Sequence, residues 1–435
     1  MQIETSILEH SMPAKTPRSM RNFWVVFTGQ ASSLLGSRFV QFTIVWWLTT
    51  TTGSASVLAL ASIMALLPQV LISPFAGPLI DRFDRRRVMI TVDAVNALAV
   101  ILLAILYLRG SVQHWHIYAL MLIRATGGAF QWPAMQASTS LMVPEDKLSK
   151  VAGLNQALIG LAAILAPPLG ALLLDVLPMQ SILAIDVATA TLAIALLMPI
   201  RIPAPKNGGA AQPMSVSEVL GDMREGLRFL SGWRGLLIIM GIAMAFNLLM
   251  IPAMSLTPIL VTEHFNGGSR EYALLEAAIG IGMVAGGLLL GAWGGFKSRL
   301  LTGFSGAIVM GIGVSLVGLA PGNLYTLALL GMAISGLMNP IVSGSIFALL
   351  QSKVPPEMQG RVFTLMMSGT AAMAPLGLAV AGPFAEVIGV QAWFVAGGAA
   401  IILMSAAAYY LPSVQKIEDE GNESAEKGEH KTPIH

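Results

Sequence analysis

The stretch Gly77-Pro78-Leu79-Ile80-Asp81-Arg82-Phe83-Asp84-Arg85-Arg86-Arg87 decides how the chain folds, because it places four arginines and two aspartates between two long apolar segments. Residues 55–80 before it carry no charged side chain, and residues 88–108 carry only Asp93. A dense basic turn between two hydrophobic segments of membrane-spanning length marks the cytoplasmic side of a bilayer. The stretch therefore predicts a transmembrane helical hairpin whose turn lies inside the cell.

The composition extends this prediction to the whole chain. The 435 residues are 55% hydrophobic and 11% charged, whereas a soluble domain carries about a quarter charged residues. A spanning helix needs about 20 apolar residues. The chain supplies twelve such runs, at 23–49, 55–80, 88–108, 115–137, 150–174, 180–200, 235–261, 272–293, 300–319, 324–350, 361–385 and 391–411. We therefore predict an all-α integral membrane protein with twelve transmembrane helices.

The positions of the basic residues predict the orientation. With the N-terminus inside, 21 of the 25 Lys and Arg residues fall in cytoplasmic segments. The outer loops hold only Arg109 and Arg270, and Arg38 and Arg124 lie within spans. Because Lys and Arg are retained on the cytoplasmic side, both termini are expected there. The same bias accounts for the basic pI, so no nucleic-acid partner is expected.

The order of the spans predicts five segments: a cytoplasmic tail at 1–22, a six-helix bundle at 23–200, a linker at 201–234, a second bundle at 235–411 and a disordered tail at 412–435. Within the linker, apolar residues recur on one helical face from Val216 to Leu230, opposite a charged face. We expect an amphipathic helix along the inner membrane surface; the alternative is a solvated linker.

An internal repeat supports two related bundles. Lys150-Val151 matches Arg361-Val362, Pro168-Leu169-Gly170 matches Pro375-Leu376-Gly377, and Gly77 matches Gly291, at offsets of 211, 207 and 214 residues. Six spans return the chain to the same side of the membrane, so the copies are parallel repeats related by an axis along the membrane normal. The predicted fold is two pseudo-symmetric six-helix bundles with a path between them.

The sequence lacks the patterns of an enzyme. It has no cysteine, no Walker loop, no metal-ligand spacing and no nucleophile-base-acid set, so we expect no cofactor, metal or catalytic residue. Five glycines in the eighth span fit close helix packing rather than a phosphate cradle: Gly280, Gly282, Gly286, Gly287 and Gly291. Without a nucleotide site, uphill transport must draw on an ion gradient or the membrane potential.

Ionisable residues within spans are costly and therefore mark function. Arg124 lies near the middle of the fourth span and either has a functional role or forms a structural ion pair that holds the N-terminal bundle together. Arg38 in the first span either binds an anionic group or pairs with an acid on a neighbouring helix. The acidic candidates for proton exchange are Asp93, Asp186 and Glu276.

Aromatic residues and methionines are candidates for a soft apolar cavity, since Met adapts to irregular ligands; lipid-facing packing is the alternative. We place Arg38 in this substrate cavity, together with Phe42, Trp46, Trp132, Phe246 and Asn247.

Three motifs resemble signatures of the major facilitator superfamily. The basic turn resembles the signature between its second and third helices at Gly77, Asp81, Arg82, Arg85 and Arg86, with Asp84 in place of a second glycine. Arg124 followed by Gly127 resembles its fourth-span signature, in which the arginine is linked to proton coupling. Pro167-Pro168-Leu169-Gly170 resembles its fifth-span exporter signature, with alanine at the first and last glycine positions.

The basic turn also suggests a conformational latch. If Asp81 meets the start of the eleventh span at Gly360-Arg361, the positive end of that helix favours the carboxylate. Glu145 or Asp146 then engages Arg85 or Arg86 on the neighbouring loop. Such contacts would close the cytoplasmic side in an outward-open state.

Longer strings are similar to the macrolide-efflux group of drug:proton antiporters, among them Asp81 to Arg85, Glu263 to Gly267 and Gly360 to Phe363. The resemblance implies a bacterial inner-membrane exporter, working as a monomer, that exchanges protons for bulky amphipathic compounds, macrolides first. An exporter of an endogenous metabolite such as a siderophore is the nearest alternative. A membrane scaffold or sensor that transports nothing is a more distant one.

Overall fold

The computed structural model describes residues 20–80, 83–144, 147–200, 202 and 216–417. All the long regular elements in this part of the chain are helices. They are α1 (Met20–Thr52), α2 (Ala55–Ile80), α3 (Arg85–Leu108), α4 (His114–Met142), α5 (Leu148–Val176), α6 (Met179–Leu197), α7 (Val216–Gly232), α8 (Arg234–Ile259), η2 (Leu260–His264), α9 (Ser269–Trp293), α10 (Arg299–Leu319), α11 (Tyr325–Lys353), α12 (Pro356–Ile388) and α13 (Val390–Tyr409).

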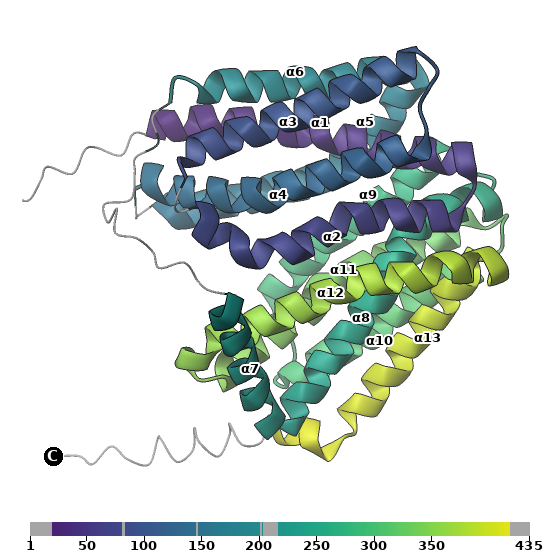
Figure 1. Ribbon diagram of the computed structural model, residues 1–435. Coiled ribbons are helices and arrows are strands. Elements are labelled where there is room, and N and C mark those ends of the chain that lie inside the picture. Colours follow the sequence, from purple (N-terminus) through teal and green to yellow (C-terminus); the bar gives the residue numbers. More distant parts are fainter. Residues whose placement is uncertain (1–19, 81–82, 145–146, 201, 203–215, 418–435) are drawn as a thin grey trace, which may run out of the picture.

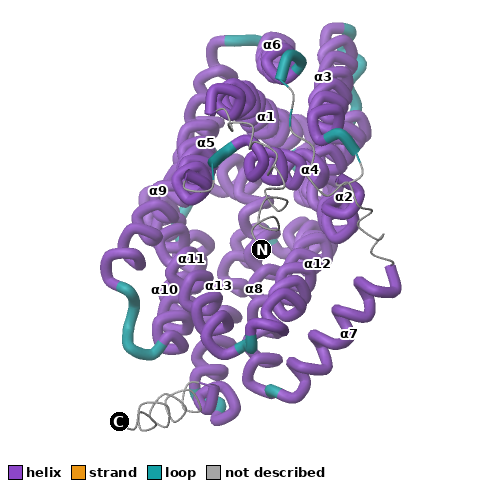
Figure 2. Tube along the Cα trace, turned by 90° about the vertical axis from the view of Figure 1, so that its left-hand side faces the viewer, coloured by secondary structure: helices purple, strands orange, loops and turns teal. Residues whose placement is uncertain are grey.

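The helices form two groups that lie side by side (Figure 1). Helices α1 to α6 make the first, called the N bundle, and α8 to α13 make the second, called the C bundle. Figure 2 shows the same division from a second direction. We call the end where α1 begins and α7 lies the linker end, and the opposite end the distal end.

Helix pairing is the same in the two bundles. In the N bundle α2 packs on α4, α1 on α5 and α6, and α3 on α4 and α6. Adding seven to each label gives pairs that also pack in the C bundle: α9 on α11, α8 on α12 and α13, and α10 on α11 and α13. Between the bundles, α5 packs on α9 and α12 packs on α2. The internal repeat in the sequence therefore corresponds to a repeat in the packing.

Within the described residues, ten helical segments are long and apolar enough to cross a membrane, counting η2 with α8. Helices α1 and α4 are equally long but more polar, with Gln30, Arg38, Arg124 and Gln131 among their residues. These four side chains line a cavity inside the N bundle. The two helices thus complete the set of twelve, and their polar residues face the protein interior rather than lipid.

The linker contains the predicted amphipathic helix, α7, which packs on the linker ends of α8 and α12 (Figures 1 and 2). Leu230 is buried against the C bundle, whereas Leu227 on another side of α7 is exposed. The C-terminal tail differs from the prediction over its first residues. Residues 412–417 are helical, and Val414 and Ile417 are buried beside α8 because these apolar side chains fill the same cluster as Leu230.

Glycines set the closest approach of α9 to its neighbours. A Cβ atom on Gly282 or Gly286 would overlap the backbone of α11, and one on Gly280 would come within 2.9 Å of Ile164 on α5. Gly287 and Gly291 have no such neighbour within 4 Å. Small residues therefore bring α9 into backbone contact with helices of both bundles.

We expect Gly286→Ala to destabilise the protein by about 1–3 kcal/mol, since overpacking forces rigid backbone apart. The adjacent Gly287→Ala is the control, because its Cβ atom meets open space. Thermal unfolding of both variants in nanodiscs checks this. Equal midpoints for the two variants would contradict the close packing of α9 on α11.

Candidate functional site

A cavity of about 540 Å³ lies inside the N bundle, between α1, α2, α3, α4 and α5. Its wall combines apolar side chains with several charged and amide side chains, and two of the predicted cavity residues, Arg38 and Trp132, lie on it. The predicted coupling residues Asp93 and Arg124 also line this cavity. Four predicted residues from three different helices therefore line one cavity.

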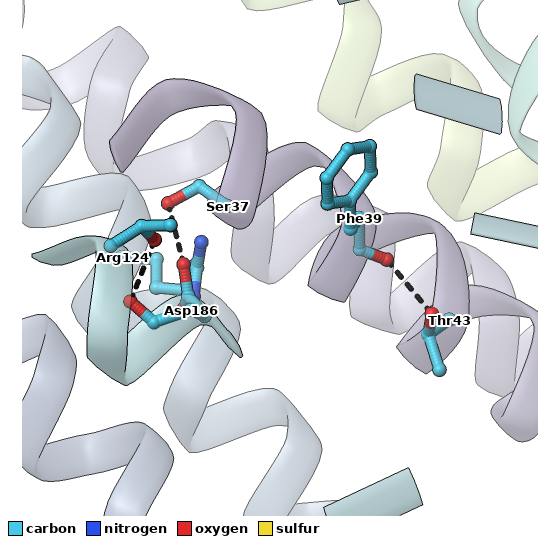
Figure 3. A network of polar contacts seen from close by, with 6 residues as sticks. Ser37, Phe39, Thr43, Arg124 and Asp186 are labelled. Carbon is cyan, nitrogen blue, oxygen red and sulfur yellow. Dashed lines mark hydrogen bonds and ion pairs between the residues drawn. The ribbon is translucent and has the colours of Figure 1, made fainter. Parts of the chain in front are cut away.

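Arg124 on α4 forms an ion pair with Asp186 on α6, with Nη1 2.7 Å from Oδ2 (Figure 3). Ser37 on α1 donates a hydrogen bond to Oδ1 of the same carboxylate, at 3.1 Å. Helix α1 comes this close because Gly36 has no side chain: a Cβ atom there would lie 3.3 Å from the Asp186 Cα. In the same figure Thr43 donates to the carbonyl of Phe39, so its hydroxyl is satisfied within α1.

Asp93 on α3 is buried and has a different environment. Its two carboxylate oxygens accept hydrogen bonds from Gln30 Nε2 at 3.0 Å and from Gln131 Nε2 at 3.2 Å. Both donors are neutral amides. The acid therefore lies in a polar cage built from α1, α3 and α4.

A second cavity, of about 450 Å³, lies inside the C bundle. Two further candidates for the substrate cavity, Phe246 and Asn247 on α8, line it. Its other lining residues are mostly apolar and include Met250, Met254, Met283 and Met310. The N-bundle cavity thus presents charged side chains that the C-bundle cavity lacks.

An aromatic stack closes the distal side between the bundles. Phe42 on α1 stacks on Tyr272 of α9 with ring centroids 5.0 Å apart, and Trp46 stacks on the same ring at 6.0 Å. Gly170 of the predicted exporter motif makes room for this stack, since a Cβ atom there would lie 2.8 Å from Phe42 Cδ1. Phe42 and Trp46 therefore belong to a distal seal rather than to the wall of the N-bundle cavity.

Arg38 and Glu276 lie one helical turn from this seal toward the linker end. Arg38 precedes Phe42 by four residues on α1, and Glu276 follows Tyr272 by four on α9. The two side chains interact electrostatically across the bundle boundary. Arg38 is exposed to the cavity, whereas Glu276 is half-buried. The arginine thus faces an acid of the opposite bundle.

Two further contacts join the bundles near the distal surface. Asp175 at the end of α5 pairs with Arg270 at the start of α9, at 2.8 Å. Glu386 near the end of α12 accepts hydrogen bonds from the Ser54 hydroxyl and the Ser56 N–H, the latter at 3.1 Å. Asp175 and Glu386 are 211 residues apart, the offset that separates Lys150 from Arg361. The distal latches, Asp175–Arg270 and Glu386–Ser54/Ser56, are therefore related by the repeat.

At the linker end, the predicted latch residues are only partly described. Asp81, Arg82 and Glu145 lie outside the described residues, and Gly77 lies in the last turn of α2. The side chain of Asp84 caps α3 by accepting the Arg86 N–H at 3.0 Å. This N-cap role gives a physical reason for aspartate where the resembling signature has a glycine.

The arginines at the linker end contact neighbouring helices. Arg85 donates to the Ala137 carbonyl of α4 at 3.1 Å, and Arg86 donates to the Met198 carbonyl after α6. The C bundle repeats the first contact, since Arg299 at the start of α10 donates to the Ala348 carbonyl of α11. Arg361, next to Gly360 on α12, pairs with Glu225 of α7 at 3.0 Å.

Comparison with known proteins assigns the family. A sequence profile described as Major Facilitator Superfamily matches residues 26–378. The chain belongs to this superfamily of transporters. It is 35% identical over 396 residues to macrolide efflux protein A of Streptococcus pyogenes, which covers 91% of this chain and 97% of that protein. It is 27% identical over 378 residues to multidrug efflux pump Tap of Mycolicibacterium fortuitum, covering 84% and 88%.

Solved structures of the same superfamily fold resemble this one. A D-xylose-proton symporter matches with a TM-score of 0.66 at 15% identity, covering 90% of this chain and 99% of that one. A bacterial homologue of the human lysosomal transporter Spinster matches with a TM-score of 0.66 at 14% identity, covering 92% and 97%. These likenesses confirm the predicted twelve-helix fold, and the family and fold predictions are both correct.

Sequence reasoning did not single out several residues of the site. Gln30 and Gln131 carry no charge, so the rule that ionisable residues within spans mark function does not identify them. Tyr272 lies at the start of its span and resembles an interfacial anchor. The repeat could have identified Asp175 and Glu386, because they are separated by the same 211 residues as Lys150 and Arg361.

We expect the double substitution Asp175→Asn/Glu386→Gln to open the distal end. Both contacts are exposed, and exposed charge contacts of this kind contribute about 0.2–1 kcal/mol each. Losing both should shift the equilibrium about two-fold or more toward the open distal end. The chain has no native cysteine, so spin labels can be placed at Val176 and Val387, which are exposed on α5 and α12.

Distance measurements between these labels should gain a longer component in the double variant. Glu263→Gln is the matched control, because Glu263 is an exposed acid at the same end of the C bundle. Identical distance distributions for wild type and the double variant would show that the latches do not hold this state.

Proposed function

We propose that this protein is a proton-coupled exporter of bulky amphipathic compounds, with macrolide-type drugs first among them, that works by alternating access. The observation that carries the proposal is the similarity to a macrolide efflux protein along nearly the full length of both chains. Similarity to a multidrug efflux pump supports the same direction of transport.

The two cavities suit such compounds. An amphipathic molecule has a polar and an apolar part, and ligand sites combine an apolar lining with a few placed polar groups. The N-bundle cavity offers Arg38, Asp93 and Arg124, whereas the C-bundle cavity offers mainly Met, Ile and Phe. A molecule that bridges the bundles would meet both kinds of surface.

The proposed moving bodies are residues 23–200 and 235–411, joined by the linker at 201–234. We assign the linker end to the cytoplasm, with both termini there, because of the basic residues at that end. The seal at Phe42 and Tyr272 then closes the outer side, so the described conformation faces inward. In the opposite conformation the distal contacts would separate, and Asp81, Arg82 and Glu145 would meet Gly360-Arg361 at the linker end.

Proton coupling is assigned to the ionisable groups inside the bundles. Arg124 and Asp186 form a pair that proton transfer to the carboxylate would weaken. Asp93 and Glu276 are the other acids that a proton can reach from a cavity or from the bundle boundary. A monomer contains the complete set of these groups, and we propose that it is the working unit.

Drug accumulation tests the proposal directly. Susceptible bacteria that express the chain should hold less radiolabelled macrolide than cells with an empty vector, and a protonophore should remove the difference. The control variant Glu263→Gln should export like wild type. Accumulation that is unchanged by expression would contradict drug export, and export that survives the protonophore would contradict proton coupling.

Substitution of the buried pair separates its structural role from proton coupling. Arg124→Gln should destabilise the protein by about 3–5 kcal/mol, because it leaves the Asp186 charge buried without a partner. The double variant Arg124→Gln/Asp186→Asn removes both charges and should recover most of that loss. Arg87→Gln breaks an exposed pair with Asp84 and should change stability by less than about 1 kcal/mol.

If the pair couples protons, the double variant should unfold like wild type in nanodiscs, yet fail to export against a gradient in proteoliposomes. Substrate exchange without a gradient should remain. Full gradient-driven export by the stable double variant would assign the pair a purely structural role.

A further inference from the structure

The charged side chains around the N-bundle cavity have partners within the protein. Arg124 is paired with Asp186 at 2.7 Å. The Asp93 carboxylate accepts hydrogen bonds from two glutamine side chains, and Arg38 interacts with an acid of the C bundle. A ligand in this cavity would therefore be recognised mainly by side chains that are not already engaged.

Three carboxamide side chains of the same cavity meet this condition. Gln41 on α1, Gln69 on α2 and Asn155 on α5 all line it. Within the part of the chain that the structure describes, none of the three forms a hydrogen bond with another residue. Gln41 and Gln69 are exposed. Asn155 is only 8% exposed, yet its amide atoms are not among the inaccessible polar atoms without a partner. The accessible part of this buried side chain is therefore its amide.

The internal repeat places methionine at two of these positions in the C bundle. Gln69 of α2 corresponds to Met283 of α9, at the offset of 214 residues that also separates the first residues of the two helices. Asn155 of α5 corresponds to Met366 of α12, at the offset of 211 residues found near the start of these two helices. Both methionines line the C-bundle cavity. At related positions, the N bundle thus presents amides where the C bundle presents thioethers, which are weak acceptors and donate no hydrogen bond.

The free amides define the kind of group that would satisfy them. A carboxamide offers two N–H donors and a carbonyl acceptor. A ligand ether or carbonyl oxygen can only accept, whereas a hydroxyl both donates and accepts through one oxygen atom. A sugar or another polyol carries several hydroxyls, so it can reach amides that come from different helices.

We propose that Gln69 and Asn155 determine substrate specificity by forming hydrogen bonds with hydroxyl groups of the transported compound, whose polar part is an uncharged, hydroxyl-rich group such as a sugar. This inference rests on the export function proposed above and narrows its substrate class to amphipathic glycosides and related polyols. Gln41 supplies a third amide on the same cavity wall. The apolar part of the molecule extends toward the C-bundle cavity, where Met283 and Met366 take the place of the two amides.

Binding to the purified full chain in nanodiscs tests the proposal without requiring transport. Three tritiated probes share one apolar body: naphthylbutyl glucoside, its tetra-O-methyl ether, which keeps the acceptor oxygens but has no O–H, and N-naphthylbutyl acetamide. Scintillation proximity, corrected with empty nanodiscs, gives each affinity. Wild type should bind the glucoside about tenfold more tightly than either of the other probes, a factor that two ordinary hydrogen bonds can supply.

Substitutions of the two amides should reduce this preference. Gln69→Met introduces the residue of the related C-bundle position, and Asn155→Leu keeps about the same side-chain size. Each should weaken glucoside binding about three- to tenfold, the effect of one hydrogen bond, and leave binding of the ether unchanged. The double variant should lose most of the preference. Gln156→Met is the matched control, because Gln156 is an exposed amide next to Asn155 that does not line the cavity; it should bind all three probes like wild type.

Four outcomes would overturn the inference. Equal binding of glucoside and ether by wild type would show that hydroxyls are not recognised, and acetamide binding as tight as glucoside binding would indicate a site for amide groups. Equal loss of glucoside and ether binding in the single variants would assign the two residues a structural role. A full preference in the double variant would place the recognition elsewhere. Cells that fail to export any macrolide would count against the proposed function alone, because the binding preference is measured without transport.

Discussion

A charged side chain within a membrane segment needs a partner or water, and this constraint arranges the N bundle. Arg124, Asp186 and Asp93 lie on three different helices, yet all face the bundle interior. Arg124 pairs with Asp186, and polar residues of α1 donate a hydrogen bond to each of the two acids. Close packing at Gly36 brings α1 to the Asp186 carboxylate. Arg124 and Asp93 line the same cavity within this bundle.

The C bundle has the same helix pairing but a different interior. Every pair of packed helices in the N bundle discussed above has its counterpart in the C bundle, while the lining changes from Gln, Asp and Arg to Met, Ile and Phe. Ridge-and-groove packing depends on side-chain size along the helix contacts, whereas the character of a cavity depends on the side chains that line the space left between the helices. The repeat could therefore keep its topology while the two interiors diverged.

Contacts within the bundles and contacts between them differ in strength. The Arg124–Asp186 pair lies within the N bundle and is nearly inaccessible, so breaking it leaves a costly buried charge. The Asp175–Arg270 pair joins the bundles and is largely exposed, so water and salt reduce its contribution. Strong contacts within each bundle and weaker contacts between the bundles would allow each bundle to move as a rigid unit. They would also allow the two bundles to separate reversibly. The aromatic seal adds area without fixed hydrogen bonds, which also allows separation.

Sequence by itself determined the number and approximate position of the helices, the repeat and the family. Apolar runs of spanning length leave little choice of structure, because a backbone in lipid must form its hydrogen bonds within the helix. The same reasoning identified Arg38, Asp93, Arg124, Asp186 and Glu276, since ionisable residues in such runs are rare. It also predicted α7 from its apolar face, although it ended the ordered chain before Val414 and Ile417.

Only the tertiary structure decided which of these residues meet. Arg124 and Asp186 are 62 residues apart in sequence, and Asp175 and Arg270 are 95 residues apart. No local sequence pattern predicts that either pair is in contact. The neutral cage of Gln30 and Gln131 around Asp93, and the stack of Tyr272 on Phe42, depend on how helices rotate about their axes. That rotation is fixed by packing against several neighbouring helices at once, and the hydropathy pattern of a single helix does not determine it.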